Sequence, residues 1–67
     1  MKLIINGETY AELKADMSVL DLLTYLNLPK AKIAVECNKE IVPKSGYKTV
    51  LLQDGDVLEI ITFIGGG

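Results

Sequence analysis

Alternating apolar and polar residues predict strands at both ends of the chain. A short apolar run over residues 2–6 leads into Asn6-Gly7, the dipeptide most typical of a two-residue hairpin turn. Residues 8–13 then return as a second strand. Ile4 lies on the face of the first strand that carries its polar neighbours, and we expect that face to be the more solvated one. The chain is therefore predicted to open with a β-hairpin.

One segment has the spacing of an amphipathic helix. Ser18 is placed to cap its first turn, and Asp21 completes a capping-box pattern. We expect the segment Asn27-Leu28-Pro29 to end the helix, since Pro29 disfavours helical geometry at Leu28. The apolar residues of the helix fall on one stripe, at Val19, Leu22, Leu23 and Leu26. This stripe predicts that the helix packs on one face of a sheet.

The second half of the chain reads as strands again. Residues 33–37 alternate, Asn38-Lys39 is typical of a tight turn, and residues 41–42 form a short strand. After turn residues at 54–56, the β-branched run 57–64 predicts a strand in the middle of the sheet. We expect this last strand to lie beside the first and parallel to it, with the helix in the crossover. The predicted fold class is α+β, with a mixed sheet of four to five strands and one main helix on one face.

The last strand also suggests a docking surface. Glu59 is costly to bury without a partner, so its face is expected to be the solvent face. Ile61 and Phe63 share that face, alongside Ile4 of the first strand. Exposed apolar residues of this kind indicate a site for a partner protein. An alternative is that these residues only fill a shallow surface. The candidate partner-binding residues are Ile4, Glu59, Ile61, Phe63 and Ile64.

Composition narrows the chemistry that the chain can perform. Its 67 residues make one domain, and a net charge of −2 with seven lysines argues against nucleic-acid binding. With one cysteine and no histidine, we expect no metal site and no histidine general base. Cys37 shares a strand face with apolar residues, so we expect it to pack rather than react. No signal peptide or membrane-length apolar run is visible, which predicts a soluble cytoplasmic protein.

The chain ends in three glycines, Gly65, Gly66 and Gly67. We divide the chain into a folded domain, residues 1–64, and a flexible tail, residues 65–67. Such a tail is often only a frayed end. As a thin arm of roughly 10 Å, however, it could carry its terminal carboxylate into a narrow channel. A carboxylate must be activated before it can react, for example by adenylation with ATP. The ATP and Mg²⁺ would bind the partner enzyme, since nothing here cradles phosphate.

Taken together, these segments resemble the ubiquitin-like β-grasp sulfur carriers, specifically the ThiS family of thiamine biosynthesis. The resemblance covers essentially all 67 residues. The motifs that carry it, in order, are the opening strand with Asn6-Gly7, Ser18-Val19-x-Asp21-Leu22-Leu23, Val35-x-Cys37-Asn38-x-x-Ile41-Val42-Pro43, Leu52-x-Asp54-Gly55-Asp56 and Ile64-Gly65-Gly66-Gly67.

The resemblance implies a carrier that is a co-substrate and not an enzyme. An adenylating enzyme of the ubiquitin-activating type (ThiF-like) would adenylate the Gly67 carboxylate with ATP. Sulfur from a persulfide would replace AMP, and the resulting thiocarboxylate would donate sulfur to thiazole synthase (ThiG-like). Gly66 and Gly67 match the terminal pair of the family, whereas Gly65 would serve flexibility only. The free protein would be a monomer that binds no cofactor.

Three alternatives remain open at the level of sequence. The small subunit of molybdopterin synthase shares the fold, the tail and the activation chemistry, although its family is usually longer. A β-grasp interaction module whose tail is never modified would also fit. A redox enzyme based on Cys37 would require a reactive thiol of low pKa.

Overall fold

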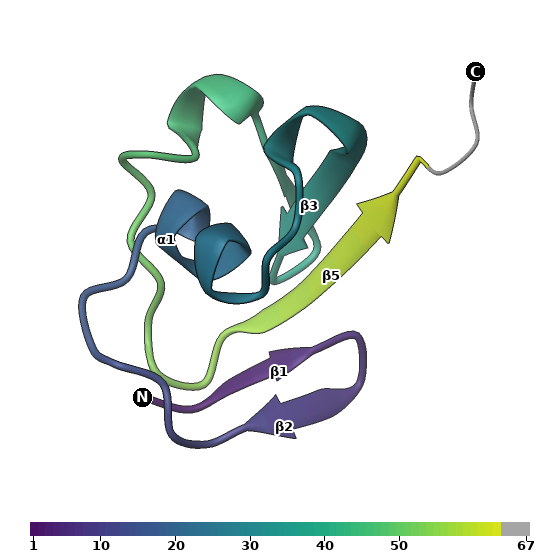
Figure 1. The fold of residues 1–67 in the computed structure, drawn as a ribbon. Coiled ribbons are helices and arrows are strands. Elements are labelled where there is room, and N and C mark those ends of the chain that lie inside the picture. Colours follow the sequence, from purple (N-terminus) through teal and green to yellow (C-terminus); the bar gives the residue numbers. More distant parts are fainter. Residues whose placement is uncertain (64–67) are drawn as a thin grey trace.

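The computed structural model describes residues 1–63 of the chain, and within them five strands and one α-helix form two layers (Figure 1). Helix α1 lies against one face of the sheet, and two short 3₁₀ turns lie in the connections. The elements are β1 (Leu3–Ile5), β2 (Glu8–Tyr10), α1 (Val19–Tyr25), η1 (Lys30–Lys32), β3 (Ile33–Cys37), β4 (Glu40–Val42), η2 (Lys44–Gly46) and β5 (Val57–Thr62).

The strand order is β2-β1-β5-β3-β4, with β5 in the centre. β5 runs parallel to β1, with Ile4 opposite Val57, and antiparallel to β3. The remaining neighbours, β1 with β2 and β3 with β4, form antiparallel hairpins. The expected fold class, including the parallel placement of the last strand beside the first, is confirmed. The second strand is shorter than predicted, because pairing with β1 stops at Tyr10.

Both hairpins turn through two residues of positive φ. Asn6 and Gly7 have φ values of 50° and 82°, and Asn38 and Lys39 have φ values of 52° and 71°. Positive φ at both central residues is the geometry of a type I′ turn, whose twist matches that of the flanking strands. Asparagine tolerates this left-handed region better than most residues. The two turns predicted at these dipeptides are therefore present.

Helix α1 begins at the predicted capping box and ends just before the predicted segment Asn27-Leu28-Pro29. Ser18 Oγ accepts the backbone N–H of Asp21 at 3.0 Å, and the Asp21 carboxylate accepts the N–H of Ser18 at 3.0 Å, which completes the capping box. At the other end, Asn27 adopts a φ of 60°. The N–H of Leu28 then donates to the carbonyl of Leu23 at 2.9 Å, the six-to-one bond of a Schellman cap. The helix therefore ends at the predicted segment Asn27-Leu28-Pro29, and within it Asn27 makes the cap.

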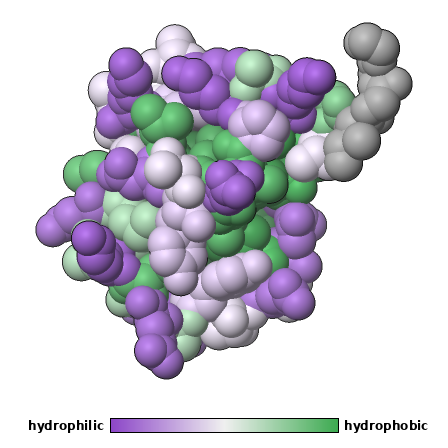
Figure 2. All heavy atoms as spheres, in the orientation of Figure 1, coloured by the Kyte–Doolittle hydropathy of each residue, from purple (hydrophilic) through white to green (hydrophobic). Residues whose placement is uncertain are grey.

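The core lies between α1 and the inner face of the sheet. Three apolar residues of the helix stripe, Val19, Leu22 and Leu23, are buried there. Tyr47, which follows η2, is also buried, and its burial was not predicted from the sequence. In the view of Figure 2, apolar residues gather where α1 meets the sheet, and polar residues surround them. Because α1 covers only one face, the other face of the sheet is left open.

Candidate functional site

The predicted reactive end of the chain falls outside the described residues. Ile64, Gly65, Gly66 and Gly67 lie beyond residue 63, so the role assigned to the Gly67 carboxylate stays a prediction. The structure does describe the strand that leads to them. After Thr62, the last residue of β5, the backbone N–H of Phe63 donates to the carbonyl of Lys32 at 2.8 Å. The described part of the candidate site therefore consists of β5 and its neighbouring strands.

β5 divides its side chains between the two faces of the sheet, as strand geometry requires. Leu58 and Ile60 are buried under α1. Val57 and Ile61 point the other way and are 45% and 50% exposed, and Glu59 between them is also exposed. The prediction that Glu59 marks the solvent face is confirmed.

The pairing registers extend this surface to the neighbouring strands. Residues directly opposite each other in a sheet share a face, and their Cβ atoms lie about 5 Å apart. Ile4 is opposite Val57, Ala34 is opposite Ile61, and Glu36 is opposite both Glu59 and Ile41. We call this surface the open face; its residues are Ile4, Ala34, Glu36, Ile41, Val57, Glu59 and Ile61.

The open face brings together most of the predicted partner-binding residues, with one difference. Ile4 is half-buried beside Val57, at the start of β5, and not beside Ile61. Ile61 follows Val57 by four positions, which is about 13 Å along β5. Phe63, 56% exposed, follows at the far end. Val57 and Ile41 also belong to the open face, as the two-residue alternation requires, and neither was among the predicted partner-binding residues.

Two carboxylates face each other in the middle of the open face. Glu36 on β3 and Glu59 on β5 are direct cross-strand partners. Like charges in this position destabilise a sheet. Apolar residues border the pair, with Ile41 opposite Glu36 on the β4 side and Ile61 on β5. The open face therefore combines apolar surface with a concentrated negative charge.

Cys37 is poorly suited to act as a nucleophile. It is part-buried at the edge of the core. Burial, followed by the negative charge of Asp56 and a hydrogen bond to it, raises the pKa of the Cys37 thiol to about 11, and the charge of Glu40 adds to this. The thiolate is the reactive form, and it is scarce when the pKa is high. The geometry agrees with the expected packing role.

Asp54 and Asp56 are occupied by the turn that precedes β5. An Asp54 carboxylate oxygen accepts the backbone N–H of Lys2 at 2.6 Å. Asp56 accepts the N–H of Gln53 at 2.8 Å and the side-chain amide of Asn38 at 3.0 Å. Carboxylates bonded in this way position the turn. They are not a free acid–base pair.

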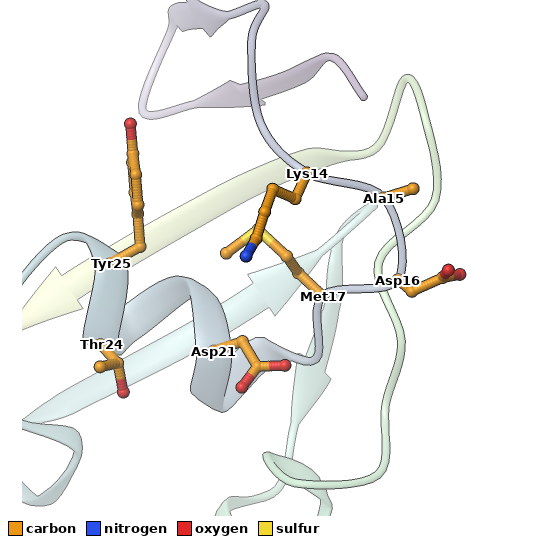
Figure 3. Close-up of a pocket in the computed structure, with 7 residues that line it drawn as sticks. All are labelled: Lys14, Ala15, Asp16, Met17, Asp21, Thr24 and Tyr25. Carbon is orange, nitrogen blue, oxygen red and sulfur yellow. The ribbon is translucent and has the colours of Figure 1, made fainter.

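A surface hollow beside α1 offers no comparable chemistry. Figure 3 shows Lys14, Asp21 and Tyr25 among its lining residues. Its lining residues come from the segment that precedes α1 and from α1 itself. Within residues 1–63, no cluster of three or more His, Cys, Asp or Glu side chains is placed to hold a metal ion. No helix in the described part of the chain has the length and apolarity needed to cross a membrane.

The chain is similar to known proteins over its whole length. The ThiS family model matches residues 3–67. The sulfur carrier protein ThiS of Bacillus subtilis is 42% identical over 63 residues, which are 94% of this chain and 96% of that protein. The crystal structure of the thiamine biosynthesis protein (ThiS) from Geobacter metallireducens matches with a TM-score of 0.83 and 32% identity, covering all of both chains.

Longer relatives contain a segment that resembles this chain. The thiazole synthase of Paramagnetospirillum magneticum is 55% identical over 67 residues, and that of Magnetococcus marinus is 40% identical. All of this chain is covered in both cases. The chain spans only 20% of the length of each of these two relatives.

The raised pKa of Cys37 predicts slow alkylation in the folded protein. With a pKa of about 11, about one thiol in a thousand is ionised at pH 8. The labelling rate of the folded chain should therefore keep rising with pH to about 11, whereas the urea-unfolded chain should level off near the ordinary value of about 8.5. Asp56→Asn should speed labelling, because it removes a negative charge. A folded-state midpoint near 8.5 would contradict this assignment.

Proposed function

This chain belongs to the ThiS family, and we propose that it is a sulfur carrier of thiamine biosynthesis whose Gly67 carboxylate is the group that holds the sulfur. The observation that carries the proposal is the family match over residues 3–67, because it includes the terminal glycines. The similarity to the Bacillus subtilis sulfur carrier, over 94% of this chain and 96% of that protein, supports it.

Adenylation explains why a carrier would end in a free carboxylate. A carboxylate is a poor electrophile, and reaction with ATP on a partner enzyme converts it into a mixed anhydride with AMP as leaving group. The outer sulfur of a persulfide on the partner then attacks the anhydride and expels AMP, which leaves an acyl disulfide. A thiol reduces the S–S bond of this acyl disulfide and is itself oxidised to a disulfide, which releases the C-terminal thiocarboxylate. The thiocarboxylate is the form that donates sulfur to the acceptor. The ATP and Mg²⁺ belong to the partner, and this chain supplies the carboxylate.

The glycines suit a reaction that takes place inside another protein. Glycine has no side chain, so Gly65, Gly66 and Gly67 require less space around the backbone than any other three residues. Extended, three residues span roughly 10 Å. The carboxylate of Gly67 can then enter a channel too narrow for the domain itself.

The open face is the docking surface in this proposal. It includes β5, the strand that leads to the tail, so a partner held there stands close to the chain end. Its exposed apolar residues, with Phe63 beyond them, offer area to bury. The opposed Glu36 and Glu59 favour a partner that places a cationic side chain between them, because this would relieve their repulsion.

Two partners follow from the carrier role. One is the adenylating, ThiF-like enzyme that activates Gly67. The other is thiazole synthase, the acceptor of the sulfur. Two relatives named thiazole synthase contain a segment similar to this whole chain, which supports an association between the carrier and that enzyme. The carrier itself performs no catalysis in this scheme.

A bulky residue at the chain end should block activation without unfolding the domain. For Gly67→Phe we expect adenylation, measured as partner-dependent exchange of pyrophosphate into ATP, to be lost. The free energy of unfolding should stay within about 0.5 kcal/mol. Gly65→Ala is the matched control and should still be adenylated. Unhindered adenylation of Gly67→Phe would contradict the narrow channel.

Removing the last two glycines separates a carrier from an interaction module. Deletion of Gly66 and Gly67 should abolish thiocarboxylate formation, read by intact mass after incubation with ATP, a sulfur source and the activating enzyme. The fold and partner docking should persist. If the deletion leaves the protein's cellular role intact, an unmodified interaction module is the better assignment.

A charge at Phe63 should weaken docking more than folding. Phe63→Asp should reduce affinity for the activating enzyme at least about tenfold, since buried aromatic residues dominate interfaces. Tyr25→Asp, at a similarly exposed aromatic residue on α1, should leave the affinity unchanged. Titration calorimetry measures both. A domain destabilised by Phe63→Asp that still binds normally would mean that the faces of the strand are reversed.

Removing the Glu59 charge should move stability and docking in opposite directions. Glu59→Gln removes the repulsion from Glu36, so the free domain should gain about 0.5 kcal/mol. Affinity for the activating enzyme should fall and become less sensitive to salt. Glu8→Gln is the control. Glu8 lies on edge strand β2 opposite the buried Ile5 of β1, so it does not share the open face. Tighter binding by Glu59→Gln would exclude a cationic partner group.

A further inference from the structure

Asn6 contributes more than a turn to this fold. Its side-chain amide bonds both backbone groups of Ile60, 54 residues later in the chain. The N–H of Ile60 donates to Asn6 Oδ1 at 2.8 Å, and Asn6 Nδ2 donates to the carbonyl of Ile60 at 3.1 Å. Both bonds are part-buried. The position was predicted as a hairpin turn, and this second role could not be seen in the dipeptide.

The amide continues the ladder between β1 and β5 by one step. The backbone N–H of Ile4 donates to the carbonyl of Asp56, and that of Asn6 donates to the carbonyl of Leu58, both at 3.0 Å. The next position along β5 is Ile60, where the chain of β1 has already turned away. A side-chain amide carries the same donor and acceptor as a peptide group. Asn6 thus replaces the missing peptide of β1.

Beyond Ile60, the hydrogen bonds of β5 come from the β3 side. Ile61 is paired with Ala34 and Thr62 with Ile33. The N–H of Phe63 then donates to Lys32. Asn6 therefore marks the point after which β5 is held along one edge only, and seven residues follow that point in the sequence.

We propose that Asn6 is a positioning residue for the chain end. By bonding Ile60, it holds β5 in place and determines where the segment that enters the partner's active site begins. The inference rests on the proposed carrier function. It assigns to Asn6 an influence on the reaction of Gly67, which the amide never touches.

The turn and the amide can be separated by mutation. The positive φ of Asn6 is tolerated by glycine, so Asn6→Gly keeps the turn and removes only the side chain. Asn6→Asp also fits the turn, but an ionised carboxylate only accepts hydrogen bonds, and it would oppose the carbonyl of Ile60. Asn6→Gly should therefore release both backbone groups of Ile60, and Asn6→Asp should lose the bond to the Ile60 carbonyl, while the hairpin persists in both.

Asn38 supplies a matched control in the same molecule. It occupies the first position of the other type I′ turn, with a φ of 52°. Its amide also makes two bonds near β5: its Oδ1 accepts the N–H of Val57 at 3.0 Å, and its Nδ2 donates to Asp56 at 3.0 Å. These contacts lie at the start of the strand. Asn38→Gly therefore removes a similar amide from the end of β5 that is far from the tail.

The experiment compares Asn6→Gly and Asn38→Gly in the full chain. Amide hydrogen exchange is followed by NMR. The Ile60 N–H should exchange at least tenfold faster in Asn6→Gly than in the wild type, and the Val57 N–H should exchange at least tenfold faster in Asn38→Gly. In adenylation by the partner enzyme, Asn6→Gly should lower kcat at least threefold with KM within twofold, because the open face still docks. Asn38→Gly should leave both constants within twofold.

The outcomes distinguish the inference from the function on which it rests. Equal losses of kcat in the two variants would make Asn6 a merely structural residue and overturn the proposal. Unchanged exchange at Ile60 in Asn6→Gly would overturn it as well, whatever the kinetics. If the wild-type chain is not adenylated at all, the carrier function fails, and the proposed influence of Asn6 on Gly67 fails with it. In that case the exchange data still report whether the Asn6 amide holds Ile60.

Discussion

The pairing of β5 along both of its edges is the constraint on which the rest of the domain depends. A strand that is parallel to β1 and follows it in sequence cannot be reached by a tight turn, so the intervening chain must cross over the sheet. Helix α1 lies in this crossover and buries its apolar stripe against the inner face. The last strand of the chain thereby becomes the central strand of the sheet.

Covering one face of the sheet leaves the two faces chemically different. The alternation along β5 places Leu58 and Ile60 under the helix and leaves Glu59 and Ile61 outside. A single strand therefore contributes to the core, to the open face and to the approach to the chain end. In the proposed function, recognition and reaction are linked through this one strand, and no separate binding domain is needed.

Local signals made much of the fold predictable from the sequence. The turn at Asn6-Gly7, the capping box at Ser18 and the solvent face at Glu59 each depend on neighbouring residues, and all three are present. The end of α1 at Asn27-Leu28-Pro29 was predicted as well, but the left-handed conformation of Asn27 was not, because asparagine permits this conformation and does not require it.

Features that depend on long-range pairing could not be read from the sequence in the same way. Strand register places Glu36 opposite Glu59. It also places Ile4 beside Val57 and away from Ile61. The burial of Tyr47 likewise depends on how the segment after β4 packs on the core. The terminal glycines were recognised from composition and resemblance, and their role stays a prediction because they follow residue 63.

The central position of β5 also determines how the domain responds to mechanical force. In the proposed function, a partner that draws the chain end into its active site would pull along β5. Hydrogen bonds in a sheet run across the strands, so tension along β5 shears the ladders to β1 and β3 together and loads many bonds at once. A chain end on an edge strand could be peeled away one bond at a time. The chain end is thus attached to the strand along which this small domain best withstands tension.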